Sequence, residues 1–147
     1  MIGVDRNGGL TRVVIDRPDK ANSLTRAMLE EIAGTAEAAA ADGTRVFVLT
    51  GRGKVFSAGA DLDEARAGLA TDPVWERLSA AIARLPCLTV AALNGTLAGG
   101  AFGMALACDV SDGVALAAAL DAAEGAHGPA RILVNCAGVA TPGRIVG

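Results

Sequence analysis

The feature that most constrains this chain is a long uncharged run, because no charged residue occurs from Leu85 to Cys108. A run of this length could span a bilayer, and Gly99 and Gly103 form a GxxxG pair within it. Pro86 near its start and the Asn94-Gly95 turn signal in its middle argue against one continuous helix. The run therefore favours a buried strand, a turn and a buried helix.

Strand and helix patterns alternate along the chain. Apolar runs predict strands at residues 11–16, 45–50, 88–93 and 131–134. Apolar residues at helical spacing predict helices over residues 23–41, from Asp72-Pro73 to Leu85, from Gly99-Gly100 to about Cys108, and from Ser111 to about Gly125. The glycine-rich segment 51–64 is expected to be neither. Such alternation predicts an α/β layered fold, with buried parallel strands.

Composition excludes several classes of function. A length of 147 residues is typical of one compact domain, and 52% hydrophobic residues exclude a disordered tail. A net charge of −3 with two lysines argues against a nucleic-acid surface and an anionic-membrane binder. Three cysteines without CxxC spacing and one histidine leave no zinc constellation. Reduced thiols and the absence of a secretory signal predict a cytoplasmic protein.

Two glycine clusters follow predicted strands and could carry chemistry. The first is Ser57-Ala58-Gly59-Ala60-Asp61, and the second is Ala98-Gly99-Gly100-Ala101 at the start of a predicted helix. Glycines free the backbone to turn and to present N–H groups, and two N–H donors from separate loops can stabilise one carbonyl oxyanion. The positive end of the second helix would add to this effect. The alternative interpretation is that these glycines only make tight turns.

Three motifs resemble the crotonase (enoyl-CoA hydratase/isomerase) superfamily in their order and spacing. They are RPDKANSL at residues 17–24, VLTGRGKVFSAGADL at 48–62 and ALNGTLAGGAFGMALACD at 92–109. The resemblance covers residues 1 to about 110, the first part of a longer family domain. It implies a coenzyme A thioester substrate, no further cofactor, fatty acid metabolism, and a trimer whose C-terminal helices would be missing.

The resemblance also implies particular site residues. The backbone N–H groups of Ala60 and Gly100 would form the oxyanion hole. The main chain around Lys20, Ala21, Ala58, Asp61 and Leu62 would line the coenzyme A site.

One departure from the family pattern bears on catalysis. Family hydratases carry a glutamate three residues after the second oxyanion glycine, where this chain has Gly103. A second acid normally follows about twenty positions later, and Glu124 near that count lies in an unrelated context, LDAAEGAHG. Because proton transfer typically contributes ~10²–10⁴-fold, loss of both acids would remove hydration as ordinarily catalysed. Other branches of the family lack the first glutamate and use a later acid, so Gly103 alone is compatible with an isomerase-type member. Hydratase/isomerase-type chemistry is expected to be weak or absent in this chain.

The last part of the chain resembles a different family, the short-chain dehydrogenases/reductases. The resemblance rests on CDVSDGVALAAALDAAEGAHGPARILVNCAG at residues 108–138. It implies weak cofactor contacts at Asp109, Val110, Asn135, Ala137 and Gly138. The phosphate-binding glycines and the Tyr-Lys catalytic pair of that family are missing, so NAD(P) binding and reductase activity are not expected.

Together the motifs predict two unequal units joined at Cys108-Asp109-Val110. Residues 1–109 are expected to form a partial crotonase-like ββα core, and residues 110–147 a Rossmann-like αβ tail. The leading functional hypothesis is acyl-CoA binding with enoyl-CoA hydratase/isomerase-type chemistry. The alternatives are a fragment of an NAD(P)-dependent oxidoreductase and a non-catalytic chimeric chain, from joined enzyme fragments or a rearranged reading frame. Apolar surface left uncovered by the missing helices should favour aggregation.

Overall fold

A computed structural model describes residues 1–108 and 132–133. The strands are β1 Ile2–Asn7, β2 Leu10–Ile15, β3 Val46–Gly51, β4 Val55–Ser57, β5 Leu88–Leu93, β6 Thr96–Leu97 and β7 Ile132–Leu133. The α-helices are α1 Arg26–Ala39, α2 Leu62–Arg66, α3 Val74–Ala83 and α4 Ala101–Leu106, and the 3₁₀ turns are η1 Pro18–Lys20 and η2 Leu69–Thr71.

Within the described residues, the main sheet has the strand order β1-β2-β3-β5-β7. The hairpin β1–β2 is antiparallel, whereas β2, β3 and β5 run parallel, as the near-continuous apolar runs predict. The short strand β7 pairs antiparallel with β5, through Ala92↔Leu133 and Leu93↔Ile132. A separate small sheet joins β4 to β6 in parallel.

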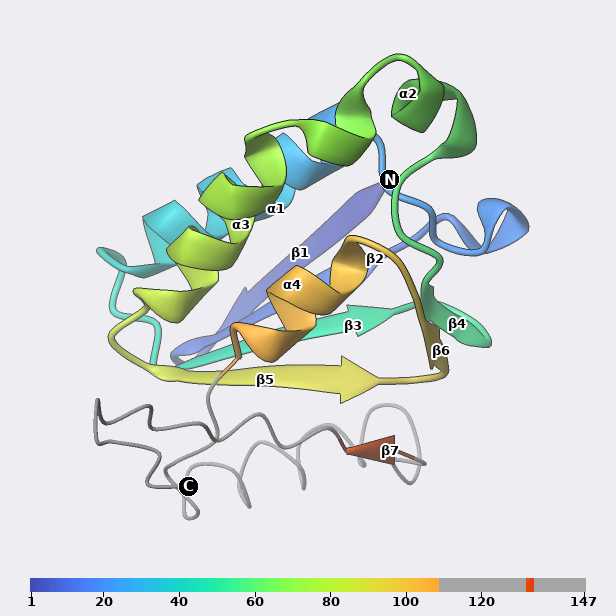
Figure 1. Ribbon diagram of the computed structural model, residues 1–147. Coiled ribbons are helices and arrows are strands. Elements are labelled where there is room, and N and C mark those ends of the chain that lie inside the picture. The colour runs from blue at the N-terminus through green and yellow to red at the C-terminus, as the bar shows by residue number, and fades with distance from the viewer. Residues whose placement is uncertain (109–131, 134–147) are drawn as a thin grey trace, which may run out of the picture.

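The helices α1, α3 and α4 lie on one face of the main sheet (Figure 1). Their apolar stripes meet alternate residues of the strands, so Phe47 and Leu49 of β3 enter this core while Val48 joins a smaller cluster with Leu88 and Val90. The helix-covered core is built from aliphatic side chains, among them the fully buried Leu29, Ile32, Leu78 and Ile82.

The glycine-rich segment 51–64 is not irregular, contrary to the prediction. It contains β4 and the first turn of α2. The strand β4 is short and its partner β6 lies about forty residues further along the chain, through pairs such as Val55↔Thr96. The helix α2 begins at Leu62 and is capped by Asp61, whose side chain accepts hydrogen bonds from the backbone N–H groups of Asp63 and Glu64.

The uncharged run folds as predicted into a strand, a turn and a helix, namely β5, the Asn94-Gly95 turn with β6, and α4. Among the described residues, no helix is long and apolar enough to cross a membrane. The predicted strand at 131–134 is present as β7, while the predicted helix from Ser111 to about Gly125 lies outside the described residues.

Candidate functional site

The two predicted glycine loops lie against each other at the ends of β4 and β6. Ala98 N donates to Ser57 O at 2.9 Å, which extends the parallel pairing of the two strands into the loops. Gly59 has a φ of +92°, and a Cβ on it would lie 2.9 Å from Ala98 O and 3.4 Å from Gly100 N. Glycine is therefore required at position 59 both for its backbone conformation and for the close approach of the second loop.

The N–H of Ala60 points toward the second loop. Leu24 N donates to Gly59 O at 2.7 Å, and Asp61 N donates to Leu24 O at 2.8 Å. The C=O and N–H of a trans peptide point in opposite directions, so the Ala60 N–H lies on the side away from Leu24. That side is occupied by the loop containing Gly100, because segment 57–60 runs between segment 21–24 and β6.

The N–H of Gly100 points out of the start of α4. Gly99 O accepts a hydrogen bond from Phe102 N at 3.2 Å, so the same peptide turns the Gly100 N–H away from the helix. Within residues 1–108, neither the Ala60 N–H nor the Gly100 N–H has a hydrogen-bond acceptor. Two unpaired backbone donors thus lie on loops that contact each other at Gly59 and Gly100.

A buried asparagine and a buried serine hold the first loop in place. Asn22 Oδ1 accepts from Arg17 N at 2.8 Å, and its Nδ2 donates to Arg52 O at 2.9 Å and to Val55 O at 2.6 Å. Ser57 Oγ donates to Asn22 O and accepts from Gly59 N. The loop carrying Ala60 is therefore tied to the segment before α1 by fully buried polar contacts.

An ion pair between Arg17 and Asp61 also ties the first loop to the segment before α1. Arg17 Nη1 donates to Asp61 Oδ2 at 2.7 Å and to Ser23 Oγ at 3.1 Å. The Arg17 hydrogen bond is the largest cause of a lowered pKa for the Asp61 carboxyl, and backbone N–H groups at the start of α2 act in the same direction. The residue next to Ala60 is thereby held as a carboxylate.

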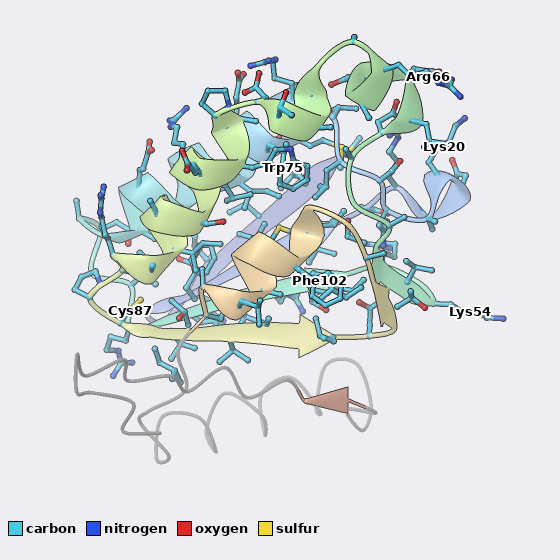
Figure 2. The ribbon with its side chains drawn as sticks, viewed as in Figure 1. Lys20, Lys54, Arg66, Trp75, Cys87 and Phe102 are labelled. Atoms are coloured by element: carbon cyan, nitrogen blue, oxygen red, sulfur yellow. The ribbon has the colours of Figure 1, made fainter. Side chains whose placement is uncertain are left out.

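The helix α3 packs closely on α4 through two glycines. A Cβ on Gly100 would lie 3.1 Å from Cε2 and Cζ2 of Trp75, and one on Gly103 would lie 3.1 Å from Ser79 Oγ. Figure 2 shows Trp75 near the start of α4. No other described residue accepts or donates a hydrogen bond at the Ser79 hydroxyl. The position where family hydratases carry a glutamate thus faces this hydroxyl.

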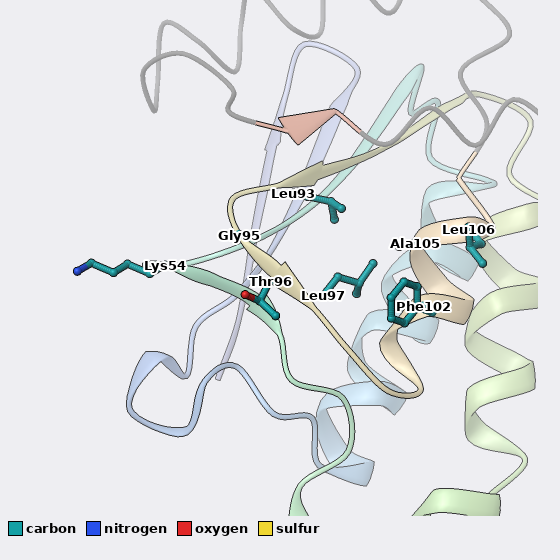
Figure 3. Close-up of a pocket in the computed structure, with 8 residues that line it drawn as sticks. All are labelled: Lys54, Leu93, Gly95, Thr96, Leu97, Phe102, Ala105 and Leu106. Atoms are coloured by element: carbon teal, nitrogen blue, oxygen red, sulfur yellow. The ribbon is translucent and has the colours of Figure 1, made fainter.

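The opposite face of α4 borders an apolar groove of about 510 Å³. Leu93, Leu97, Phe102, Ala105 and Leu106 contribute most of its wall, and Figure 3 shows these side chains around the opening. Phe102 is 48% exposed and Leu106 is 60% exposed. None of the loop residues 57–61 and 98–101 lines this groove, although Leu97 directly precedes the second loop.

The structure brings several of the predicted site residues together. Ala58 N donates to Ala21 O at 3.0 Å, which joins the two segments expected to line the coenzyme A site. Lys20 ends the exposed turn η1 (Figure 2), Asp61 caps α2, and Leu62 is exposed at the first position of α2. The predicted dinucleotide contacts lie outside the described residues: Asp109, Val110, Asn135, Ala137 and Gly138. So does Glu124.

Sequence reasoning missed the residues that position these loops. Asn22 lies inside the RPDKANSL motif, and its left-handed φ of +53° next to Ala21 at +50° marks a tight turn that no spacing rule indicated. Trp75 lies in the helix predicted from Asp72-Pro73 to Leu85, and its position there indicates no special role. Its contact with Gly100 joins segments 25 positions apart, and only the folded chain reveals it.

The two described cysteines, Cys87 and Cys108, lie outside the glycine loops at residues 57–61 and 98–101. Among the described residues, no three His, Cys, Asp or Glu side chains gather in a way that could hold a metal ion. Cys87 is a free thiol, and burial is the main cause of its raised pKa, while Cys108 Sγ donates to Met104 O at 3.6 Å.

The chain thus combines an α/β layered fold with two adjacent glycine loops. The backbone N–H groups of Ala60 and Gly100 in these loops have no acceptor among residues 1–108. The chain belongs to the enoyl-CoA hydratase/isomerase family, whose model matches residues 5–121. The matched range includes both loops and extends past the predicted join at Cys108–Val110.

Known relatives support this assignment. The chain is 36% identical over 120 residues to 4-chlorobenzoyl coenzyme A dehalogenase-1 of an Arthrobacter species, covering 75% of this chain and 44% of the relative. It is 39% identical over 107 residues to a probable enoyl-CoA hydratase of Rhodobacter capsulatus, covering 69% and 41%.

Solved structures show the same fold. The crystal structure of an enoyl-CoA hydratase from Mycobacterium avium subsp. paratuberculosis matches with a TM-score of 0.68 and 38% identity, covering 74% of this chain and 45% of that one. An enoyl-CoA hydratase from Bacillus anthracis matches with a TM-score of 0.62 and 36% identity, covering 74% and 45%. The chain spans less than half the length of these relatives. The comparisons give no support to the short-chain dehydrogenase/reductase resemblance.

Proposed function

We propose that this chain binds the thioester carbonyl of an acyl-coenzyme A between the N–H groups of Ala60 and Gly100. The observation that carries the proposal is the pair of unpaired donors that two adjacent loops direct to one junction. Preorganised backbone donors stabilise negative charge that develops on a carbonyl oxygen, as in a thioester enolate. Two relatives whose names specify different reactions, a dehalogenase and a hydratase, share a coenzyme A thioester in those names.

The coenzyme A portion would lie along the main chain near Lys20, Ala21, Ala58, Asp61 and Leu62. The hydrogen bond from Ala58 N to Ala21 O supports this placement, because it makes one continuous surface of both segments. Lys20 and its exposed turn place a positive charge beside this surface, which suits a phosphate-bearing ligand. No separate cofactor is needed for carbonyl polarisation of this kind.

Turnover is proposed to be weak or absent. Gly103 cannot exchange a proton, and the nearby Ser79 hydroxyl has no described carboxylate or imidazole partner that would make it a base. The geometry therefore favours binding and polarisation of the thioester over hydration.

Titration calorimetry with butyryl-CoA and with free coenzyme A tests the proposal, since free coenzyme A lacks the carbonyl. We expect the wild-type chain to bind butyryl-CoA more tightly, and Ala60→Pro to lose that preference because proline has no N–H. Ala60→Gly keeps the donor and serves as the control. The Ala60 N–H has no acceptor among residues 1–108, so proline breaks no hydrogen bond of the described fold. Equal affinities of the wild type for both ligands would refute the proposal.

The remaining predictions from the sequence are kept as proposals. They are a cytoplasmic location, a role in fatty acid metabolism, a trimer completed by other helices, and a chimeric join that adds a dehydrogenase-like segment at residues 110–147. A fluorescence titration with NADH tests whether the segment at residues 110–147 binds a dinucleotide. We expect no binding, because the phosphate-binding glycines are missing.

A further inference from the structure

The contact between Trp75 and Gly100 has a consequence for the second backbone donor. Gly100 has a φ of −59° and a ψ of −19°, an ordinary right-handed helical conformation that any residue adopts. Backbone conformation therefore does not require glycine at position 100. A side chain at position 100 would instead meet the indole, because a Cβ there would lie 3.1 Å from Cε2 and Cζ2 and 3.2 Å from Cδ2 of Trp75, closer than ordinary van der Waals contact.

The indole is itself held in place. Trp75 Nε1 donates to Leu69 O at 2.9 Å, and Leu69 is buried in the turn before α3. The helix α3 is anchored at the same end, since Asp72 Oδ1 accepts from Val74 N and the Asp72 carboxylate pairs with Arg26 of α1. The ring therefore forms a fixed wall against which the backbone of Gly100 rests.

We infer that Trp75 is a positioning residue for the Gly100 N–H. The indole sets the distance between α3 and the start of α4, and so sets where the Gly100 donor lies relative to the Ala60 donor. This inference rests on the proposed function, in which both donors contact one thioester oxygen. It adds that position 100 is restricted to glycine by Trp75 rather than by backbone strain.

The contact between Gly103 and Ser79 differs, because the neighbouring group there can move. A Cβ on Gly103 would meet only the Ser79 hydroxyl, a single atom that can rotate aside. The planar indole, anchored at Nε1, has no comparable freedom. Added volume at position 100 would consequently displace the backbone of the loop, together with its N–H.

A double-mutant cycle tests the inference, using the ratio of butyryl-CoA to coenzyme A affinity measured by calorimetry. We expect Gly100→Ala to reduce this ratio about three- to tenfold, the range expected for one weakened hydrogen bond. In a Trp75→Ala background the same Gly100→Ala change should have no further effect. A merely structural role would lower the melting temperature and the affinities for both ligands together, leaving the ratio unchanged. Gly34→Ala is the matched control, since a Cβ on Gly34 in α1 meets nothing within 4 Å.

Two further measurements keep the result decisive. If Gly100→Ala fails to fold, Trp75→Phe takes its place, because it retains a ring but loses the Leu69 hydrogen bond. Its ratio of butyryl-CoA to coenzyme A affinity should lie between those of the wild type and Trp75→Ala. The chain has one tryptophan, so Gly100→Ala should also shift its emission, and Gly34→Ala should not. Equal effects of Gly100→Ala in both backgrounds, or unchanged emission, would overturn the inference. A wild-type ratio of one would instead overturn the proposed function, while the emission test still decides whether Trp75 contacts Gly100.

Discussion

At the scale of single residues, Gly59 combines two constraints that can be separated by experiment. Its φ is +92°, and a Cβ on it would lie 2.9 Å from Ala98 O, a backbone atom that cannot move aside alone. We expect Gly59→Ala to lower the free energy of unfolding by about 2–4 kcal/mol, from a strained conformation plus forced separation of the loops. Urea denaturation measures this loss.

Gly53→Ala provides the control. Gly53 also has a positive φ, +82°, but a Cβ there would meet only Pro18 Cβ at 3.5 Å. This variant should therefore lose only the backbone contribution, about 1–2 kcal/mol. Similar losses for the two variants would show that the loops are not in close contact at Gly59.

The carboxyl of Asp61 gives a pH-dependent prediction. Its pKa is lowered from 3.8, with the hydrogen bond from Arg17 as the largest cause. A carboxyl whose pKa is lower in the folded state than in the unfolded state stabilises the fold at pH values above the unfolded-state pKa. This contribution is lost as the pH falls through the folded-state pKa. Asp61→Asn should therefore be less stable than wild type near neutral pH, and the difference should narrow below pH 3.8.

Thermal denaturation of both proteins at a series of pH values measures that difference. Other carboxyls with lowered pKa, such as Glu37 beside Arg77 and Asp42 beside Thr44, are common to both proteins and cancel in the comparison. A difference in stability that stays constant into acid would contradict the prediction.

At the scale of secondary-structure elements, the apolar pattern predicted β2, β3, β5 and β7 but missed β1, β4 and β6, and it predicted the helix starts less well. The strand β5 occupies residues 88–93 as expected, because burial on both faces leaves a continuous apolar run. The helix α1 starts at Arg26 rather than Ser23, because Thr25 caps it through Met28 N while the Ser23 hydroxyl binds Arg17 instead. Local sequence offers two capping hydroxyls, and one of them binds Arg17, six residues before Ser23.

The candidate site was predictable only as far as its motifs extend. Resemblance identified both loops, and the structure places them side by side. The network around Asn22 and the Trp75 contact were not predictable, because each joins segments far apart in the sequence. The helix α2 could have been found, since Asp61 followed by Asp63 and Glu64 is a typical helix start.

Asn22 links the segment before α1 to the ends of β3 and β4, which makes it a test of how these elements are joined. Its side chain is fully buried and makes three hydrogen bonds to backbone groups. Asn22→Ala would leave Arg17 N and Arg52 O short of partners, so we expect a loss of about 2–4 kcal/mol in unfolding free energy. Chemical denaturation measures it.

Asn94→Ala is the matched comparison for this prediction. Asn94 also makes three hydrogen bonds to backbone groups, those of Gly51, Gly53 and Val55, but it is only partly buried. Water can replace some of its contacts, so this variant should lose less stability than Asn22→Ala. The reverse order would show that burial does not control the strength of these links.

At the scale of the whole molecule, the outer face of α4 determines how the chain behaves in solution. Phe102 and Leu106 are 48% and 60% exposed, and they border the groove beside Leu93 and Leu97. Because these large apolar side chains are exposed beside one another, we expect this surface to drive self-association. Replacing both residues in Phe102→Ser/Leu106→Ser should reduce that association while changing the unfolding free energy little, since both side chains are largely exposed.

Sedimentation velocity at increasing protein concentration distinguishes association through the surface of α4 from nonspecific association. Leu62→Ser is the control, because Leu62 is 73% exposed but lies on α2, outside the groove. We expect wild type and Leu62→Ser to form larger species at the same concentrations, and the double variant to remain monomeric. If all three associate equally, the groove is not the surface of contact, and the uncovered apolar area that matters must lie elsewhere on the molecule.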